Sequence, residues 1–325
     1  MFRRIASLLD PFLLALVATV VLASVLPARG AFVPLVDGAA DAGIVLLFFL
    51  HGAKLSREAI WEGARNWRLH LAVLAMTFAL FPLLGLAARA LPFLPVEFGA
   101  GLLFLALLPS TVQSSIAFTA IARGNVAAAV CAASFSNFAG IFVTPALVAL
   151  LMGRATGGFS WASAETIVLQ LLLPFVAGHL LRPWIGGFIA CHKAWVGKVD
   201  RGSILLVVYA AFGAAVVEGL WQRVAPLSLL VLTLVCLVML ALVLAATWQT
   251  AKAMKLPRED AIVLLFCGSK KSLASGVPMA GVLFPAASVG IVLLPVMVFH
   301  QLQLIACALI APRLGQRDPE QETAA

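Results

Sequence analysis

The chain has 325 residues, of which 63% are hydrophobic and 11% are charged, and its formal net charge is +8. Because soluble domains carry about a quarter of their residues as charges, this composition excludes a soluble protein and predicts an integral membrane protein. The basic residues form no run, so they indicate membrane topology rather than a nucleic-acid-binding site. The expected partners are therefore the lipid bilayer and a small molecule, and no nucleic acid.

Apolar segments of about 20 residues, the length that crosses a bilayer as a helix, recur along the whole chain. They predict an all-α polytopic membrane protein with ten transmembrane helices, at residues 11–27, 34–52, 68–90, 97–121, 126–151, 164–186, 203–220, 226–248, 259–283 and 287–311. The connections are short, so no soluble domain is expected between the spans. Residues 313–325 are predicted to form a polar cytoplasmic tail.

The orientation of these spans follows from the distribution of basic residues. With the N-terminus inside, sixteen of the 22 Lys and Arg residues fall on the cytoplasmic side and four fall outside. This asymmetry predicts that both termini are cytoplasmic. The remaining two basic residues, Lys270 and Lys271, lie within a predicted span.

Two of the predicted spans are interrupted by polar residues. Residues 107–137 read LLPSTVQSSIAFTAIARGNVAAAVCAASFSN and break at Pro109, while residues 265–278 read LFCGSKKSLASGVP and break at the two lysines. An even division places five spans in residues 1–152, starting inside, and five in residues 153–312, starting outside. We therefore predict two inverted five-helix repeats, in which the broken spans four and nine cross.

Broken helices inside a bilayer expose backbone groups, and these are tolerated only within protein or beside a watery cavity. Free carbonyl groups suit a cation, helix N-termini suit an anion, and nearby hydroxyl and amide groups add neutral ligands. The alternative is that small hydroxyl residues only pack helices closely and bond to their own backbone. The candidate substrate- or ion-binding residues are Ser110, Thr111, Gln113, Ser114, Ser115, Ser134, Asn137, Ser269, Lys270, Lys271 and Ser272.

Lys270 and Lys271 are the most specific of these candidates, because a charged side chain at mid-bilayer is expensive and points to a function. Such a lysine can replace a bound cation, neutralise an anionic substrate or exchange a proton; the alternative is that both side chains extend to a wet surface. We predict that one of them faces the cavity, within reach of the break at 109–115. Asp41 is the candidate counter-charge or gate, unless it marks a hydrated span end.

The sequence resembles a known family of transporters. The stretch 109–151 has a proline-led polar break, then ARGN, then a helix of small residues ending in TPA; FFLHGAKLS at 48–56 and CGSKKSLASGVPMA at 267–280 extend the likeness. Together these motifs resemble the bile acid:sodium symporter (SBF) family over nearly the whole chain. The amino-acid sequences of these motifs are most similar to the branch that includes the vertebrate seventh bile acid cotransporter member and its bacterial relatives.

This resemblance implies a fold, a mechanism and a location. The fold is a ten-span inverted repeat, with a core of spans three to five and eight to ten and a panel of spans one, two, six and seven. Transport proceeds by movement of the core against the panel, that is, by alternating access. For a bacterial relative the membrane is the inner membrane.

The sodium ligands of the family are altered in this chain. In the sodium-coupled members the broken ninth span carries a glutamate and, four residues on, a glutamine; the matching positions here are Cys267 and Lys271. Hydroxyl ligands of the other sodium site fall on Ala129 and Ala133. The resemblance therefore supports a transporter, and it leaves sodium and protons open as coupling ions.

The sequence is compatible with two functions and gives no support to a third. The first is a secondary active transporter of an organic anion or similar solute, coupled to sodium or protons. The second, which the resemblance allows, is a membrane regulator of calcium influx that moves no solute itself. The third, an integral membrane enzyme, has no support, because HExxH, paired carboxylates and a nucleophile with its base are all missing from the sequence. The five cysteines show no metal-ligand spacing, so neither a metal centre nor a cofactor is expected.

Overall fold

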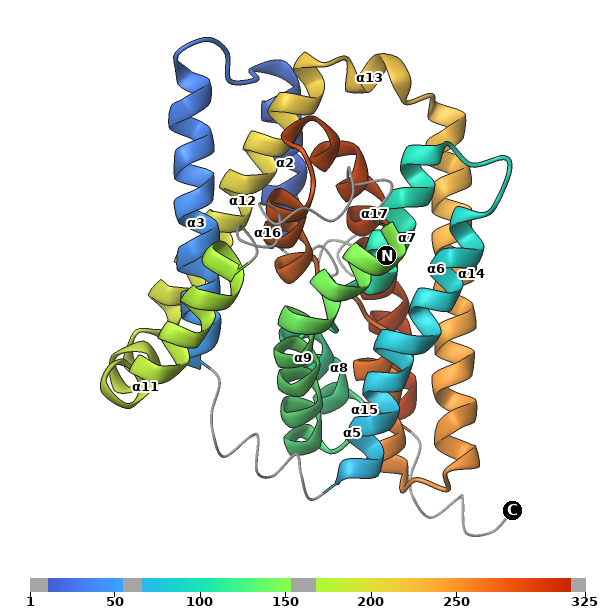
Figure 1. Ribbon diagram of the computed structural model, residues 1–325. Helices are drawn as coiled ribbons and strands as arrows, with labels where there is room; N and C mark the ends of the chain where they lie inside the picture. Colours follow the sequence, from blue (N-terminus) through green and yellow to red (C-terminus); the bar gives the residue numbers. More distant parts are fainter. Residues whose placement is uncertain (1–10, 55–65, 153–167, 317–325) are drawn as a thin grey trace.

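The computed structural model describes residues 11–54, 66–152 and 168–316, and within these ranges all regular structure is helical (Figure 1). The first half contains α2 (Pro11–Val25), α3 (Phe32–Lys54), α5 (Trp67–Ala75), η1 (Met76–Leu80), α6 (Phe81–Arg89), α7 (Val96–Leu107), α8 (Gln113–Ile121) and α9 (Val126–Met152). The second half contains η2 (Val168–Leu172), α11 (Leu173–Cys191), α12 (Lys193–Val217), α13 (Leu220–Arg223), α14 (Pro226–Ala253), α15 (Arg258–Gly268), α16 (Leu273–Leu283) and α17 (Ala286–Gly315).

Seven helices in the described residues are long and apolar enough to cross a membrane. The all-helical membrane fold is thereby confirmed, while the count of ten spans and the inverted repeat stay predictions. The segments expected to form spans four and nine are built as pairs of short helices, α7 with α8 and α15 with α16. Helix α17 runs to Gly315, so the predicted tail begins later than residue 313; residues 317–325 and the repeat boundary near 153 lie outside the described residues.

Local sequence explains where the two broken segments leave the helix. Leu108 takes an extended conformation (φ −73°, ψ 155°) directly before Pro109, which disfavours helix in the residue that precedes it. In the second segment, Ser272 is extended and its Oγ accepts a hydrogen bond from the backbone N–H of Ser275. This is an ordinary N-cap, and it starts α16.

A π-helical turn, η1, interrupts the helix that runs from Trp67 to Arg89. Within it the backbone N–H of Phe81 bonds to the carbonyl of Met76, five residues earlier. In the same register the carbonyl of Thr77 would accept from residue 82, but residue 82 is proline and has no N–H. The Thr77 carbonyl is therefore released from the helix and needs a donor from elsewhere.

The helices form two groups with a cavity between them. On one side α3 packs against α11 and α12, and α2 packs against α12; on the other, α7 packs against α6 and α17, and α15 packs against α5, α8, α9 and α14. Figure 1 shows α3 and α11 at one edge of the molecule and α14 at the opposite edge. Helix α12 also contacts α16 and α17, so it joins the two groups.

The largest apolar core lies where α7, α12, α16 and α17 meet. Aromatic side chains hold it at two points: the rings of Phe104 and Phe284 meet edge to face at 5.0 Å, and those of Phe81 and Phe299 at 5.9 Å. Edge-to-face pairs add to the burial of their apolar area. The core thus fixes α7, which ends at the first break, and α16, which begins after the second break.

Two glycines let α3 and α11 touch backbone to backbone. A Cβ atom on Gly52 would lie 2.0 Å from the carbonyl oxygen of Phe175, and one on Gly178 would lie 2.0 Å from that of Phe49. No side chain fits at either position without separating the helices. Glycine is therefore required at both, by close approach rather than by backbone conformation.

We expect Gly52→Ala and Gly178→Ala each to lower the free energy of unfolding by at least about 1–3 kcal/mol, the usual cost of overpacking. The matched controls are Gly38→Ala on α3 and Gly187→Ala on α11, where an added Cβ meets nothing within 4 Å. These controls should be neutral or stabilising by up to about 1 kcal/mol, because alanine is the better helix former. Thermal unfolding of the purified variants in detergent measures the difference, and equal midpoints for all four variants would contradict the packing described.

Candidate functional site

The two broken segments are joined directly to each other. The backbone N–H of Ser272 donates to the carbonyl of Pro109 at 2.8 Å, and the hydroxyl of Ser110 donates to the carbonyl of Cys267 at 2.5 Å. One turn further on, the Ser115 hydroxyl donates to the carbonyl of Phe266 at 3.0 Å. Residues about 160 positions apart in the sequence thus form one crossing, and each break supplies donors for the other.

The end of α7 leaves a row of carbonyl groups without helical partners, and each of them is satisfied. From Ala106 to Ser110 the five successive carbonyl oxygens accept hydrogen bonds from Lys271 Nζ, Thr144 Oγ1, Lys271 Nζ, Ser272 N and Asn137 Nδ2 in turn. An unsatisfied carbonyl in an apolar interior costs several kcal/mol. The donors from α9 and from the second break are therefore what make an interruption at this depth possible.

Lys271 is the central donor of the crossing. Its side chain is fully buried, and Nζ donates to the carbonyls of Thr77, Ala106 and Leu108 at 2.8, 2.8 and 2.6 Å. An ammonium group has three N–H donors, so all of its hydrogen-bonding capacity is used. It also lies 4.2 Å from the ring centroid of Phe81 and beside the C-terminal, negative end of α7. The ammonium group thus occupies a buried position surrounded by three carbonyl oxygens.

Gln303 holds the backbone of Lys271 in place from α17. Its Oε1 accepts from the backbone N–H of Lys271 at 2.8 Å, and its Nε2 donates to the backbone carbonyl of the same residue at 2.9 Å. Nε2 also lies 2.9 Å from Nδ1 of His300. Sequence reasoning missed Gln303, Thr77 and Thr144; the one available signal was that each is polar within an apolar helix.

Lys270 is equally buried but has different surroundings. Its Nζ makes no hydrogen bond with any described residue, and the groups beside it are the rings of Phe118, at 4.3 Å, and Phe266, at 5.5 Å. Burying an ammonium without acceptors costs several kcal/mol, whereas a desolvated cation–π contact returns about 2 kcal/mol. The two neighbouring lysines therefore differ in hydrogen bonding: Lys271 Nζ has three acceptors and Lys270 Nζ has none among the described residues.

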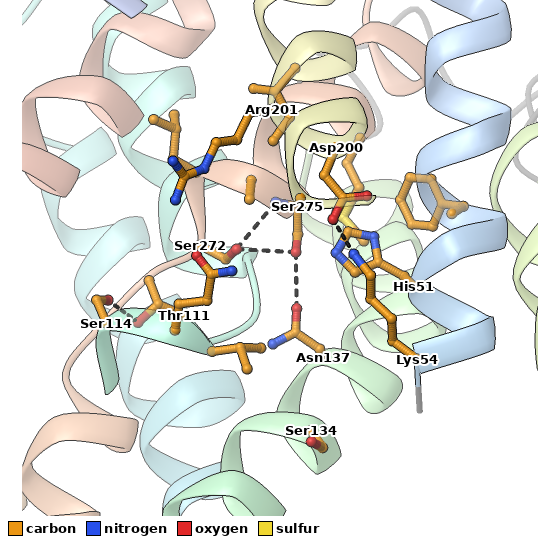
Figure 2. A pocket seen from close by; sticks show the side chains of 18 of the residues that line it. His51, Lys54, Thr111, Ser114, Ser134, Asn137, Asp200, Arg201, Ser272 and Ser275 are labelled. Atoms are coloured by element: carbon orange, nitrogen blue, oxygen red, sulfur yellow. Dashed lines mark hydrogen bonds and ion pairs between the residues drawn. The ribbon is translucent and has the colours of Figure 1, made fainter. Parts of the chain in front are cut away.

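A cavity of about 440 Å³ lies between the two groups of helices, beside the crossing. Of the predicted site residues, it is lined by Thr111, Gln113, Ser114, Ser134, Asn137 and Ser272. Figure 2 shows the chain of hydrogen bonds on this wall, in which Ser272 donates to Ser275 at 3.1 Å and Ser275 donates to Asn137 at 2.9 Å. The structure thus brings together hydroxyl and amide groups from α8, α9 and α16.

The opposite wall carries charged residues that the sequence did not predict for the site. His51 and Lys54 come from the end of α3, and Asp200 and Arg201 come from α12, with an ion pair between Lys54 and Asp200 (Figure 2). The predicted span started at residue 203, whereas α12 begins at Lys193. The additional turns place charged residues along the cavity instead of in a loop.

Three of the predicted site residues, all serines, do not line the cavity. Ser110 and Ser115 are buried and donate to carbonyls of the other break, and Ser269 donates at 2.5 Å to Leu265 of its own helix. These three hydroxyls therefore satisfy backbone groups at the crossing. Ser269 follows the alternative in which a hydroxyl bonds to its own backbone.

The prediction that one lysine faces the cavity is wrong. Neither Lys270 nor Lys271 lines it, because one side chain extends toward the carbonyls of α7 and η1 and the other toward the rings on α8 and α15. Asp41 is exposed on α3 and does not line the cavity, so it is not a counter-charge to either lysine in this conformation. The carboxylate at the cavity is that of Asp200.

Comparison with known proteins identifies the family. Residues 10–316 match the SBF-like CPA transporter family. The chain belongs to this family. It is 51% identical over 320 residues to YfeH of Escherichia coli, whose name describes a candidate symporter, with 98% of this chain and 96% of YfeH covered. It is 54% identical over 311 residues to a protein of Pseudomonas aeruginosa, covering 95% and 93% of the two chains.

More distant relatives place the chain near the branch expected from its motifs. It is 24% identical over 276 residues to sodium/bile acid cotransporter 7 of the rat, covering 83% of this chain and 81% of the relative. The resemblance drawn from the sequence is thereby confirmed. This SBF-like protein is a membrane transporter and not an enzyme, and its partners are the bilayer and a transported solute.

The two hydrogen bonds between the Gln303 side chain and the backbone of Lys271 can be tested with two glutamines on α17. Gln303→Leu should lower the free energy of unfolding by about 2–5 kcal/mol, because it leaves a buried N–H and a buried carbonyl of Lys271 unpaired. Gln301→Leu is the matched control: the Oε1 atom of Gln301 is buried without a hydrogen-bond partner among the described residues, so the change should stay within about 0.5 kcal/mol. Thermal unfolding in detergent measures the stability of both variants. An equal loss of stability in the two would contradict a role for Gln303 in holding the Lys271 backbone.

Proposed function

We propose that this protein is a secondary active transporter that moves an organic anion by alternating access, with Lys271 in the place of a coupling cation. The observation that carries the proposal is the charge of the cavity. Of the charged residues that line it, Lys54 and Asp200 pair with each other, which leaves Arg201 as the unbalanced charge. The guanidinium of Arg201 has no ion-pair partner among the described residues and lies 5.7 Å from the ring centroid of Phe12.

The start of α8 adds to this positive character. Val112, Gln113 and Ser114, which surround its N-terminus, line the cavity, and no side chain caps the helix there. The first N–H groups of a helix are free donors and carry a partial positive charge. An anionic group in the cavity would satisfy them, in the same way that carboxylates and phosphates bind at other helix N-termini.

The remaining walls suit the organic part of such a solute. Phe48, Phe138, Phe175, Ile204 and Met279 are among the residues that line the cavity. Binding sites for small organic molecules are mostly apolar, with a few polar groups that fix orientation. A solute with an anionic head near Arg201 and α8 and an apolar body against these rings is therefore the class that the cavity favours.

The mechanism that we propose follows from the two groups of helices. The polar wall belongs to α8, α9 and α16 of the predicted core, and the charged wall belongs to α3 and α12 of the predicted panel. A solute bound between them would move when one group shifts against the other. We place the protein in the bacterial inner membrane with both termini in the cytoplasm, so that the end carrying Lys54 faces the cytoplasm.

Sodium is not required at the crossing in this proposal. The ammonium of Lys271 already occupies the position among the carbonyls of Thr77, Ala106 and Leu108. The coupling ion that we favour is the proton.

The binding proposal predicts that organic anions stabilise the folded protein. A set of aromatic and aliphatic carboxylates, sulfates and sulfonates should include members that raise the free energy of unfolding by about 2.7 kcal/mol at 100 times their Kd. The gain should be lost in Arg201→Gln and kept in Lys198→Gln, which removes an exposed charge outside the cavity on the same helix. Thermal unfolding in detergent is the readout.

Counterflow of the best anion into proteoliposomes then tests transport itself. Uptake that depends on Arg201 supports the transporter. Stabilisation by neutral or cationic compounds alone would contradict the anion class. Binding without uptake would instead favour a regulatory membrane protein that moves no solute.

A further inference from the structure

Two adjacent lysines at the second break form a natural matched pair. Both side chains are fully buried, and each Nζ lies over two aromatic rings: Phe118 and Phe266 for Lys270, Phe81 and Phe78 for Lys271. They differ in hydrogen bonding, since Lys271 Nζ donates to three carbonyls and Lys270 Nζ has no acceptor among the described residues. The aromatic contacts are alike, so the acceptors decide which lysine keeps its proton.

The surroundings of Lys270 contain no carboxylate that would hold its charge. The titratable groups that act on it are the thiols of Cys267, on α15, and Cys307, on α17. Helix α8 has no charged residue, and α14 has one, Lys252, in its last turn. The acidic residues of α15, Glu259 and Asp260, lie in its first turn, at the far end of the helix from the break. The neutral amine is therefore the form that this conformation stabilises.

We propose that Lys270 is the proton-binding site of this transporter, free of its proton in the conformation described here and occupied when the core takes its alternate position. This inference rests on the proposed alternating-access function. Because binding and conformation are linked reciprocally, a proton that binds the alternate conformation better will drive the protein toward it. Lys271 keeps a permanent positive charge at the crossing, and Lys270 changes its charge beside it.

The interface between α8 and α15 has a second feature that fits such a change. Thr119 on α8 is another buried side chain whose oxygen has no hydrogen-bond partner among the described residues. Unsatisfied buried groups are rare in native structures and call for an explanation. A shift of α8 against α15 offers one, because it would expose these groups to water or bring donors and acceptors together.

The charge of Lys270 can be measured without any solute, through the pH dependence of unfolding. Wherever the folded protein binds no proton at Lys270 and the pH is below the ordinary lysine pKa of about 10.4, unfolding takes one proton up. Raising the pH then favours the folded state. The unfolding equilibrium constant of wild type, relative to Lys270→Met, should fall by up to about tenfold per pH unit between about pH 8 and 10, in sodium-free choline buffers.

Lys271→Met is the control for this experiment. Lys271 keeps its proton in both states, so the difference between wild type and this variant should not change with pH over the same range. An identical pH dependence for wild type and Lys270→Met would show that Lys270 stays charged in the folded protein, and it would overturn the proposal.

A direct measurement covers the case in which Lys270→Met does not fold. In wild type labelled with ¹⁵N at lysine Nζ, one resonance at about pH 9, where ordinary lysines are still charged, should have the shift of a neutral amine, and it should disappear in Lys270→Arg. Arginine cannot release its proton, so this variant also fixes the charge. A spectrum in which all lysines are ammonium groups would overturn the proposal.

Access to the cavity tests the link to transport separately. In a Cys191→Ser background, a cysteine introduced by Ser134→Cys lies in the cavity, and its labelling by a thiol reagent reports opening. Relative to the exposed Cys191 of wild type, labelling should decrease severalfold from pH 9 to pH 6, and the decrease should vanish in Lys270→Arg. A neutral Lys270 with pH-independent access would refute the proposed coupling while leaving anion binding at Arg201 untouched.

Discussion

The structure depends on one requirement: carbonyl groups released where helices break inside an apolar interior must find donors. At the end of α7 five successive carbonyls need partners, and a sixth is freed at Thr77 by a π-helical turn and a proline. The second break passes beside them and supplies a backbone N–H from Ser272 and an ammonium from Lys271. The other polar contacts of the crossing likewise pair released backbone carbonyls with hydrogen-bond donors.

A lysine at this position has a consequence for the transport cycle. In sodium-coupled relatives, the resemblance implies that a bound sodium ion is held at this break. Here the cation is covalently attached and cannot leave. In the proposed cycle the cation therefore stays at the crossing throughout, and a driving ion acts elsewhere. Lys270, which shares the break but none of the carbonyls, is the group available for that role.

The sequence allowed both breaks and most of one cavity wall to be predicted, because these depend on local signals. Pro109 stops a helix by its own chemistry, and small polar residues cluster where the backbone leaves the helix. Thr111, Gln113, Ser114, Ser134, Asn137 and Ser272 follow from that pattern and do line the cavity. The sequence motifs around the two breaks also indicated the family, and the comparisons confirm it.

The directions of the two lysine side chains could not be predicted. They depend on acceptors supplied by distant residues: the Thr77 carbonyl is free only because of its π-helical register, and Gln303 reaches the break from α17. The charged wall was missed for a related reason. Hydropathy ends a predicted span where charges begin, whereas α12 continues through Asp200 and Arg201, which line the cavity.

The most direct test of this account asks whether Lys271 stands in the place of a cation. The measurement is the thermal unfolding midpoint of wild type and of Lys271→Ala in sodium, choline and methylammonium chloride at equal ionic strength. We predict the same midpoint for wild type in all three salts, and a lowered midpoint for the variant that methylammonium partly restores by binding the vacated carbonyls. A sodium-specific rise in wild type would contradict the account, because it would reveal a cation site that Lys271 does not fill.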